Sequence, residues 1–148
     1  QEAADYMEKY LETFAGVRNY MYRIKEQAKR DGYVSTLLGR RRWLPELRSS
    51  NYNLRAFGER VALNMPIQGT AADVMKLAMI RVARRLQAEG LQARLILQVH
   101  DELIVECPQE EQETVRALLT EEMEGAGSFA VPLVAEAGAG RSWAEAKG

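Results

Sequence analysis

The segment Arg94–Glu106, RLILQVHDELIVE, decides the fold of this chain, because it encodes two short strands joined by an acidic turn. Apolar residues occupy alternate positions on both sides of the turn, as half-buried strands require: Leu95, Leu97, Val99, Leu103 and Val105. The two runs are separated by so little chain that we predict a β-hairpin with His100 and Asp101 at its tip.

The residues of this turn favour a chemical role. Hairpins usually turn on Asn-Gly or Asp-Gly, so a turn built from His100, Asp101 and Glu102 has a conformational cost. One interpretation is a charged turn that merely keeps the hairpin soluble. The other, which we favour, is that the carboxylates at the tip bind a metal ion.

A second polar pattern lies upstream, where Arg60, Asn64 and Gln68 are spaced four residues apart. On a helix they project from one face. Carboxamides offer both donors and acceptors, which suits the minor-groove edge of a duplex, where acceptors recur at similar positions for every base pair. The residues alone leave two interpretations, a solvated polar face or a surface that contacts duplex DNA.

Arginines are densest at Arg40, Arg41 and Arg42. Guanidinium groups bind phosphate well, so this cluster is either a contact to a template strand or a charged hairpin rim. Arg48 and Arg55 are weaker candidates of the same kind. The whole chain has a net charge of −1, but residues 1–94 hold 17 Lys and Arg against 10 Asp and Glu, whereas residues 95–148 hold 3 against 11. This asymmetry indicates one region for a phosphate backbone and another for metal ions or solvent.

Length and composition indicate a globular protein. With 148 residues of which 47% are hydrophobic, the chain can bury a core. No apolar run approaches the roughly 20 residues that span a bilayer, and no signal-peptide pattern opens the chain. The single cysteine, Cys107, excludes an internal disulfide, and we expect it to pack as a small hydrophobe in the second strand. We therefore expect a reducing, cytoplasmic setting and no membrane partner.

The remaining segments predict mainly helices. We expect two helices that meet near Gly16 and end at Gly32, a short hairpin over 33–44, a helix from Leu54 to Pro66, another from Gly69-Thr70 to Gly90, one over 109–124, and a last strand over 128–134. Pro66 should end or kink its helix because the ring removes a backbone donor, and Thr70 can cap the helix that follows. The expected fold class is α+β, with helices and an antiparallel hairpin or sheet.

Three motifs resemble the family A DNA polymerases, the group of bacterial DNA polymerase I. QVHDE at 98–102 resembles the family's second catalytic-carboxylate motif. RVALNMPIQGTAAD at 60–73 resembles its palm helix, and GYVSTLLGRRR at 32–42 resembles the small hairpin near the end of its fingers. The motifs occur in the family's order and spacing.

The resemblance implies fold, activity and partners. It implies that residues 1–53 are the last part of the fingers and that residues 54–148 are the last part of the palm. It further implies two-metal nucleotidyl transfer with Mg²⁺, with Asp101 as a metal ligand and Glu102 as a secondary catalytic carboxylate. Arg60, Asn64 and Gln68 would contact the primer-template duplex, and His100 would lie beside the primer terminus.

The family's first metal-binding aspartate and its nucleotide-gripping lysine and tyrosine have no counterpart here. We therefore expect a C-terminal piece of a polymerase that works with deoxynucleoside triphosphates and with the remaining palm, fingers and thumb. We expect the whole polymerase, of which this chain would be a piece, to act at the bacterial nucleoid, and the isolated piece to be inactive. The alternative is a duplex-binding module without catalysis.

Overall fold

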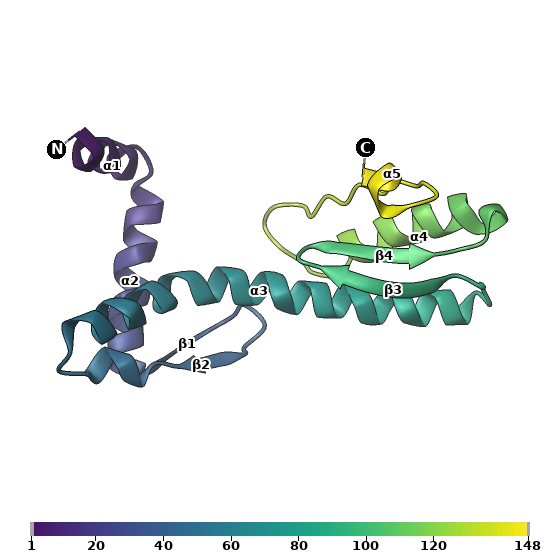
Figure 1. Cartoon of the computed structure of the whole chain (residues 1–148). Coiled ribbons are helices and arrows are strands. Elements are labelled where there is room, and N and C mark those ends of the chain that lie inside the picture. Colours follow the sequence, from purple (N-terminus) through teal and green to yellow (C-terminus); the bar gives the residue numbers. More distant parts are fainter. Residues whose placement is uncertain (1, 148) are drawn as a thin grey trace. The chain divides into compact units, whose positions relative to one another are not determined.

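The computed structural model describes residues 2–147, with side chains from Asp5 onward, and its fold is α+β as expected. Helices predominate, and the described residues form two separate antiparallel sheets of two strands each (Figure 1). The chain divides into two compact units, Gln1–Thr70 and Ala71–Gly148. The division between fingers and palm expected at residues 53 and 54 is a functional boundary and stays a prediction.

The first unit begins with two helices, α1 (Glu2–Thr13) and α2 (Ala15–Asp31), which confirms the expected break near Gly16. The strands β1 (Tyr33–Ser35) and β2 (Arg41–Trp43) then pair antiparallel as the expected short hairpin. The 3₁₀ turn η1 (Pro45–Arg48) leads toward the next helix. A small core holds these elements together through the buried side chains of Ala28, Val34, Leu44 and Ala62.

One helix, α3 (Tyr52–Ala88), replaces the two that we expected on either side of Pro66. We expected Pro66 to end or kink its helix; the end is wrong, because α3 continues through Pro66 for 22 further residues, and the kink stays a prediction. Thr70 is not a cap either. Its hydroxyl donates to the Pro66 carbonyl and accepts the Leu37 N–H at 3.0 Å, so it ties the small hairpin to the helix.

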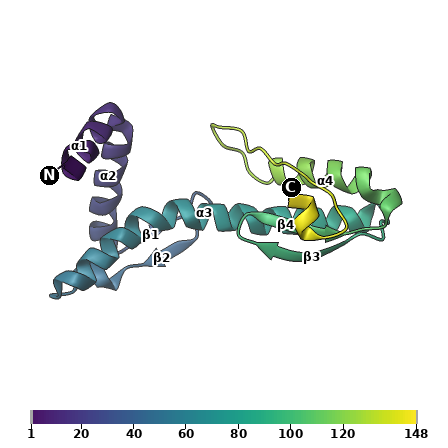
Figure 2. The same ribbon diagram turned by 45° about the horizontal axis from the view of Figure 1, so that its top comes forward.

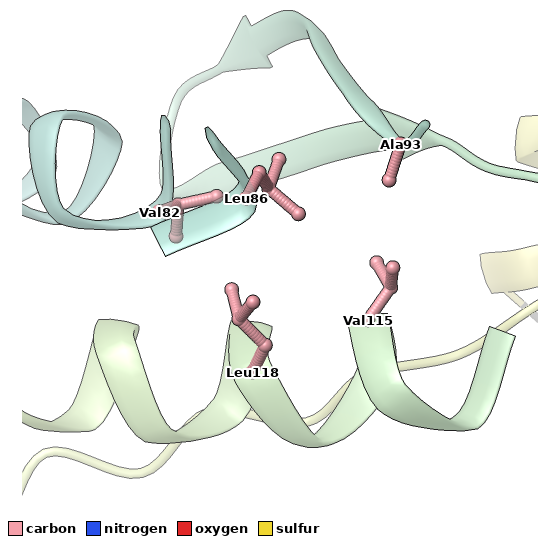
Figure 3. Close-up of a cluster of buried hydrophobic side chains, with 5 residues drawn as sticks. All are labelled: Val82, Leu86, Ala93, Val115 and Leu118. Carbon is pink, nitrogen blue, oxygen red and sulfur yellow. The ribbon is translucent and has the colours of Figure 1, made fainter. Parts of the chain in front are cut away.

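The second unit contains the later part of α3, the hairpin of β3 (Arg94–Val99) and β4 (Glu102–Glu106), the turn η2 (Gln109–Glu111) and α4 (Gln112–Glu124). Its core joins side chains that point toward one another from α3 and α4, with Ala93 just before the hairpin (Figure 3). These residues are Val82, Leu86, Ala93, Val115 and Leu118. Burying a side chain such as Leu118 contributes about 2 kcal/mol. Cys107 packs against this core directly after β4, not within the strand.

An ionic cluster also joins α3 to α4. Arg81 Nε lies 2.7 Å from one Glu122 oxygen, and Arg85 Nη1 lies 2.9 Å from the other. The two guanidinium groups hold the pKa of Glu122 below its usual value. Since Glu122 is almost fully buried, these partners are what make its charge tolerable there.

The last strand expected over 128–134 is absent from the part of the chain that the structure describes. Among the described strands, β3 and β4 pair only with each other, and side chains of α4 bond the backbone at 135–137. Glu124 accepts the Ala135 N–H at 3.1 Å, and Arg116 donates to the Ala137 carbonyl at 2.7 Å. The short helix α5 (Trp143–Lys147) follows. Among the described residues, no helix is long and apolar enough to cross a membrane.

Candidate functional site

The tip of the β3–β4 hairpin is where the sequence predicted it. Val99 pairs with Glu102, so His100 and Asp101 form the turn. His100 has φ of 53°, a left-handed conformation that costs a non-glycine residue about 1–2 kcal/mol. The Gln98 amide donates to the His100 carbonyl at 2.6 Å and so helps hold this backbone. The turn is therefore a locally supported shape that carries polar side chains.

A β-bulge interrupts the alternation that the sequence indicated. Leu95 pairs with Val105, but Leu97 pairs with Ile104, so Ile96 is an extra residue in β3. Leu97, directly after the bulge, is 46% exposed although the sequence pattern placed it on the half-buried face. Such a bulge increases twist and re-aims the end of a hairpin, here the end that carries Asp101.

The two carboxylates next to the tip have different surroundings. Asp101 is exposed in the turn, whereas Glu102 is half-buried at the start of β4. Both oxygens of Glu102 accept hydrogen bonds from α5, one from Lys147 Nζ at 2.6 Å and the other from Trp143 Nε1 at 3.2 Å. The Lys147 ammonium holds the pKa of Glu102 below its ordinary value. Glu102 is thus an ionised group with hydrogen-bonding partners, whereas the neighbouring Asp101 is exposed to solvent.

The donors at the tip fit one part of a magnesium site. Asp101 offers a carboxylate, the hard oxygen ligand that Mg²⁺ prefers. No group of three or more His, Cys, Asp or Glu within the described residues could enclose a metal ion. Because Mg²⁺ commonly keeps several waters and uses one or two carboxylates, Asp101 suits a site whose other ligands come from elsewhere.

The polar face predicted on the helix forms one wall of a groove in the first unit. Arg60, Asn64 and Gln68 are all exposed on α3, and among the described residues their side chains have no hydrogen-bonding partner. They line a groove of about 570 Å³ together with Arg40, Arg41 and Arg42. The structure therefore brings two patterns together that are separate in the sequence, the carboxamide face and the arginine cluster.

The three arginines of the cluster have different neighbours. Arg40 Nη2 donates to the Gly69 carbonyl at 2.9 Å, which anchors the small hairpin to α3. Gly69 also lets the hairpin lie close to α3, since a Cβ at this position would be only 2.8 Å from the Thr36 methyl group. The Arg41 guanidinium lies 4.7 Å from the centre of the Tyr33 ring, and Arg42 lies 4.0 Å from Glu46. Arg41 and Arg42 remain exposed enough to meet a phosphate.

Arg55 has a local structural contact that the sequence did not indicate. Its Nη1 donates to the carbonyls of Ser49 and Ser50, at 2.8 and 2.7 Å, and so holds the loop that precedes α3. Its expected role in DNA binding stays a prediction, as do those of the other candidate residues. Sequence reasoning also missed Trp143 and Lys147. Their only signal was a spacing of four residues, which puts both side chains on one helical face.

Comparisons with known proteins agree with these motifs. The sequence model described as "DNA polymerase family A" matches residues 1–145. DNA polymerase I of Bacillus caldotenax is 53% identical over 147 residues, which are 99% of this chain and 17% of that protein. DNA polymerase I of Mycobacterium tuberculosis (strain ATCC 25618 / H37Rv) is 51% identical over 143 residues, or 97% of this chain and 16% of that protein.

A solved structure is similar over nearly the whole chain. It is the POL domain of Pol1 from M. smegmatis, in complex with DNA primer-template and dNTP. The TM-score is 0.96 with 50% sequence identity, covering 99% of this chain and 26% of that one. The chain thus spans only about a sixth of the length of the curated relatives it matches.

Proposed function

Because this chain belongs to DNA polymerase family A, we propose that it is the later fingers and palm part of a bacterial DNA-directed DNA polymerase. The reaction would be template-directed DNA synthesis in replication and repair. The substrates would be primer-template DNA and deoxynucleoside triphosphates, and the enzyme would work where the chromosome lies, at the nucleoid in the cytoplasm.

The observation that carries this proposal is the β3–β4 tip, where a supported turn presents Asp101 beside a carboxylate that is already partnered. Asp101 would hold Mg²⁺, and Glu102 would act as a secondary carboxylate. Bound Mg²⁺ ions would supply charge stabilisation for the in-line displacement at phosphorus. His100 would contact the DNA beside the primer terminus, because it occupies the same turn as the proposed ligand.

The groove of the first unit supports a duplex-binding role. Arg60, Asn64 and Gln68 would read the minor-groove edge, whose acceptors recur at similar positions for every base pair. A polymerase needs such sequence-independent contact, because it must accept any correct pair. Arg40 and Arg41 would contact template phosphate, with Arg55 a lesser contributor that also fixes its own loop.

The remaining parts of the active site would come from the rest of the polymerase. Two metal ions need more than the ligands at one hairpin tip, and the described residues hold no further cluster. We therefore expect an aspartate on an upstream palm strand and a nucleotide-gripping fingers helix outside this sequence. The isolated chain should bind DNA weakly and in a salt-sensitive way, without extending a primer.

A second candidate function is duplex binding without catalysis. It is favoured by the groove alone, whose polar side chains need no metal ion. The two functions differ in one measurable respect, because only the first requires Asp101.

Primer extension tests the proposal directly. The full-length protein that contains this sequence should extend a primer on a template when given Mg²⁺ and all four deoxynucleoside triphosphates. The 148-residue chain, freed of contaminating polymerase, should give no product under the same conditions. Duplex binding by a full-length protein that never extends a primer would favour the binding module instead.

A further inference from the structure

The short helix α5 donates two hydrogen bonds to a side chain of the proposed catalytic hairpin, Glu102. In both ribbon views α5 folds back toward β4 (Figures 1 and 2). Trp143 and Lys147 are four residues apart, so both reach the same side of α5. Between them they occupy both oxygens of Glu102, the residue that follows Asp101.

We propose that Lys147 and Trp143 are positioning residues that hold Glu102 away from the metal and leave Asp101 as the hairpin's metal ligand. This inference rests on the proposed function and deepens it, because it assigns a role to the last helix in the same site. Lys147 would also balance the charge of Glu102, so that the tip presents the net charge of one carboxylate.

The geometry suits this role better than a general role in stability. The Lys147 ammonium lies 2.6 Å from Glu102 and 5.9 Å from the centre of the Trp143 ring, so two contacts define its position. Its side chain is 62% exposed, and exposed ion pairs contribute little to folding free energy. Lys147 is therefore held closely although its ion pair adds little to stability. We infer that its main effect is to fix the direction in which the Glu102 carboxylate points.

The electrostatic argument extends to Asp101. The pKa of Lys147 is raised mainly by Glu102, and the charge of Asp101 adds to that rise. Lys147 therefore experiences the field of both carboxylates. Without it, Glu102 would keep only the Trp143 hydrogen bond, and the tip would carry two uncompensated negative charges that both attract a divalent cation.

The test uses the full-length polymerase with Lys147→Ala, and Lys76→Ala as a matched control. Lys76 is an exposed lysine of the same unit, on α3, so its loss changes the net charge by the same amount. Two quantities are measured: the single-turnover extension rate, and binding of Mn²⁺ alone to the polymerase–DNA complex, followed by the electron paramagnetic resonance signal of free Mn²⁺.

We expect Lys147→Ala to lower the extension rate about tenfold, because a released Glu102 would compete with Asp101 for the metal ion; this size is at the lower end of that known for groups surrounding a metal's ligands. The same variant should bind Mn²⁺ more tightly than the wild type, because the released Glu102 adds an uncompensated charge. Lys76→Ala should change neither quantity. Lys147→Arg should recover most of the rate, since it keeps a cationic donor, and Trp143→Phe should have a smaller effect than Lys147→Ala.

A double variant separates positioning from a general loss of structure. If Lys147 acts mainly through Glu102, Lys147→Ala should tighten Mn²⁺ binding far less in a Glu102→Gln background, where no carboxylate charge is released and only the weaker field of Lys147 at Asp101 is lost. Normal extension with unchanged Mn²⁺ binding in Lys147→Ala would overturn the inference, and so would weaker Mn²⁺ binding. Failure of the wild-type enzyme to extend any primer would instead overturn the proposed function.

Discussion

The groove of the first unit and the hairpin tip of the second differ in how many side chains would contribute to their proposed roles. The groove spreads its polar side chains over a helical face and an arginine cluster. On that face, the side chains of Arg60, Asn64 and Gln68 have no hydrogen-bonding partner among the described residues. In the proposed function, the tip concentrates the chemistry in one exposed carboxylate, beside a second one whose oxygens already accept hydrogen bonds from α5. Losses in the groove should therefore be graded, whereas a loss at the tip should be nearly complete.

The largest effect is expected for Asp101→Asn in the full-length polymerase. Replacing a charged metal ligand by an amide removes transition-state stabilisation, so the single-turnover rate should fall about 10³-fold. Glu102→Gln should be milder, because Glu102 is held by α5. Rapid-quench extension of a labelled primer measures both rates. An Asp101→Asn enzyme with a normal rate would remove the tip from the catalytic site.

The next effect concerns the two cores, which are separate clusters of buried side chains. Leu118→Ala in the second unit and Leu44→Ala in the first should each lower the free energy of local unfolding by about 3 kcal/mol, since each leaves a cavity. Hydrogen exchange read by mass spectrometry should show faster exchange around the substituted core only. Equal loss of protection in both units from either substitution would mean that they fold as one.

A smaller effect is expected on the groove wall. Asn64→Ala and Gln68→Ala should each weaken binding of primer-template DNA about threefold to tenfold, the value of one or two hydrogen bonds. The loss should be similar for templates of different sequence, because minor-groove acceptors recur at every pair. Fluorescence anisotropy on several duplexes checks this. A strong dependence on one base pair would contradict minor-groove contact.

The smallest effect should appear in the salt dependence of binding. Arg41→Gln should reduce the slope of log affinity against log salt concentration by about one, as expected for one lost phosphate contact. Arg23→Gln is a suitable control, because Arg23 is an exposed arginine of the same unit, on α2. An identical slope in the Arg41 variant would assign Arg41 to the hairpin rim, where it packs on Tyr33.

Local patterns in the sequence were enough to predict the parts that depend on near neighbours. The hairpin tip followed from alternating apolar residues around an acidic turn, and the groove wall followed from the spacing of four between Arg60, Asn64 and Gln68. The break between α1 and α2 was equally local. The family motifs then gave these parts their proposed roles, which remain to be tested.

The features that were missed depend on distant contacts. Pro66 lies inside a continuous helix, and the Thr70 hydroxyl contacts a hairpin 33 residues away instead of capping a helix. No strand forms over 128–134 in the described chain, and side chains of α4 instead bond the backbone at Ala135 and Ala137. Glu102 and Lys147 are 45 residues apart, so no local pattern could pair them.

The central claim is that the tip carries the chemistry and the groove binds the duplex. The most direct test measures two quantities on the same two variants of the full-length polymerase. These are the dissociation constant for primer-template DNA and the single-turnover extension rate at saturating DNA, for Asp101→Asn and for Gln68→Ala. We predict a crossed result: Asp101→Asn binds DNA like the wild type and barely extends it, whereas Gln68→Ala binds more weakly and loses far less rate. Proportional losses of binding and rate in both variants would contradict the assignment of chemistry to the tip and duplex binding to the groove.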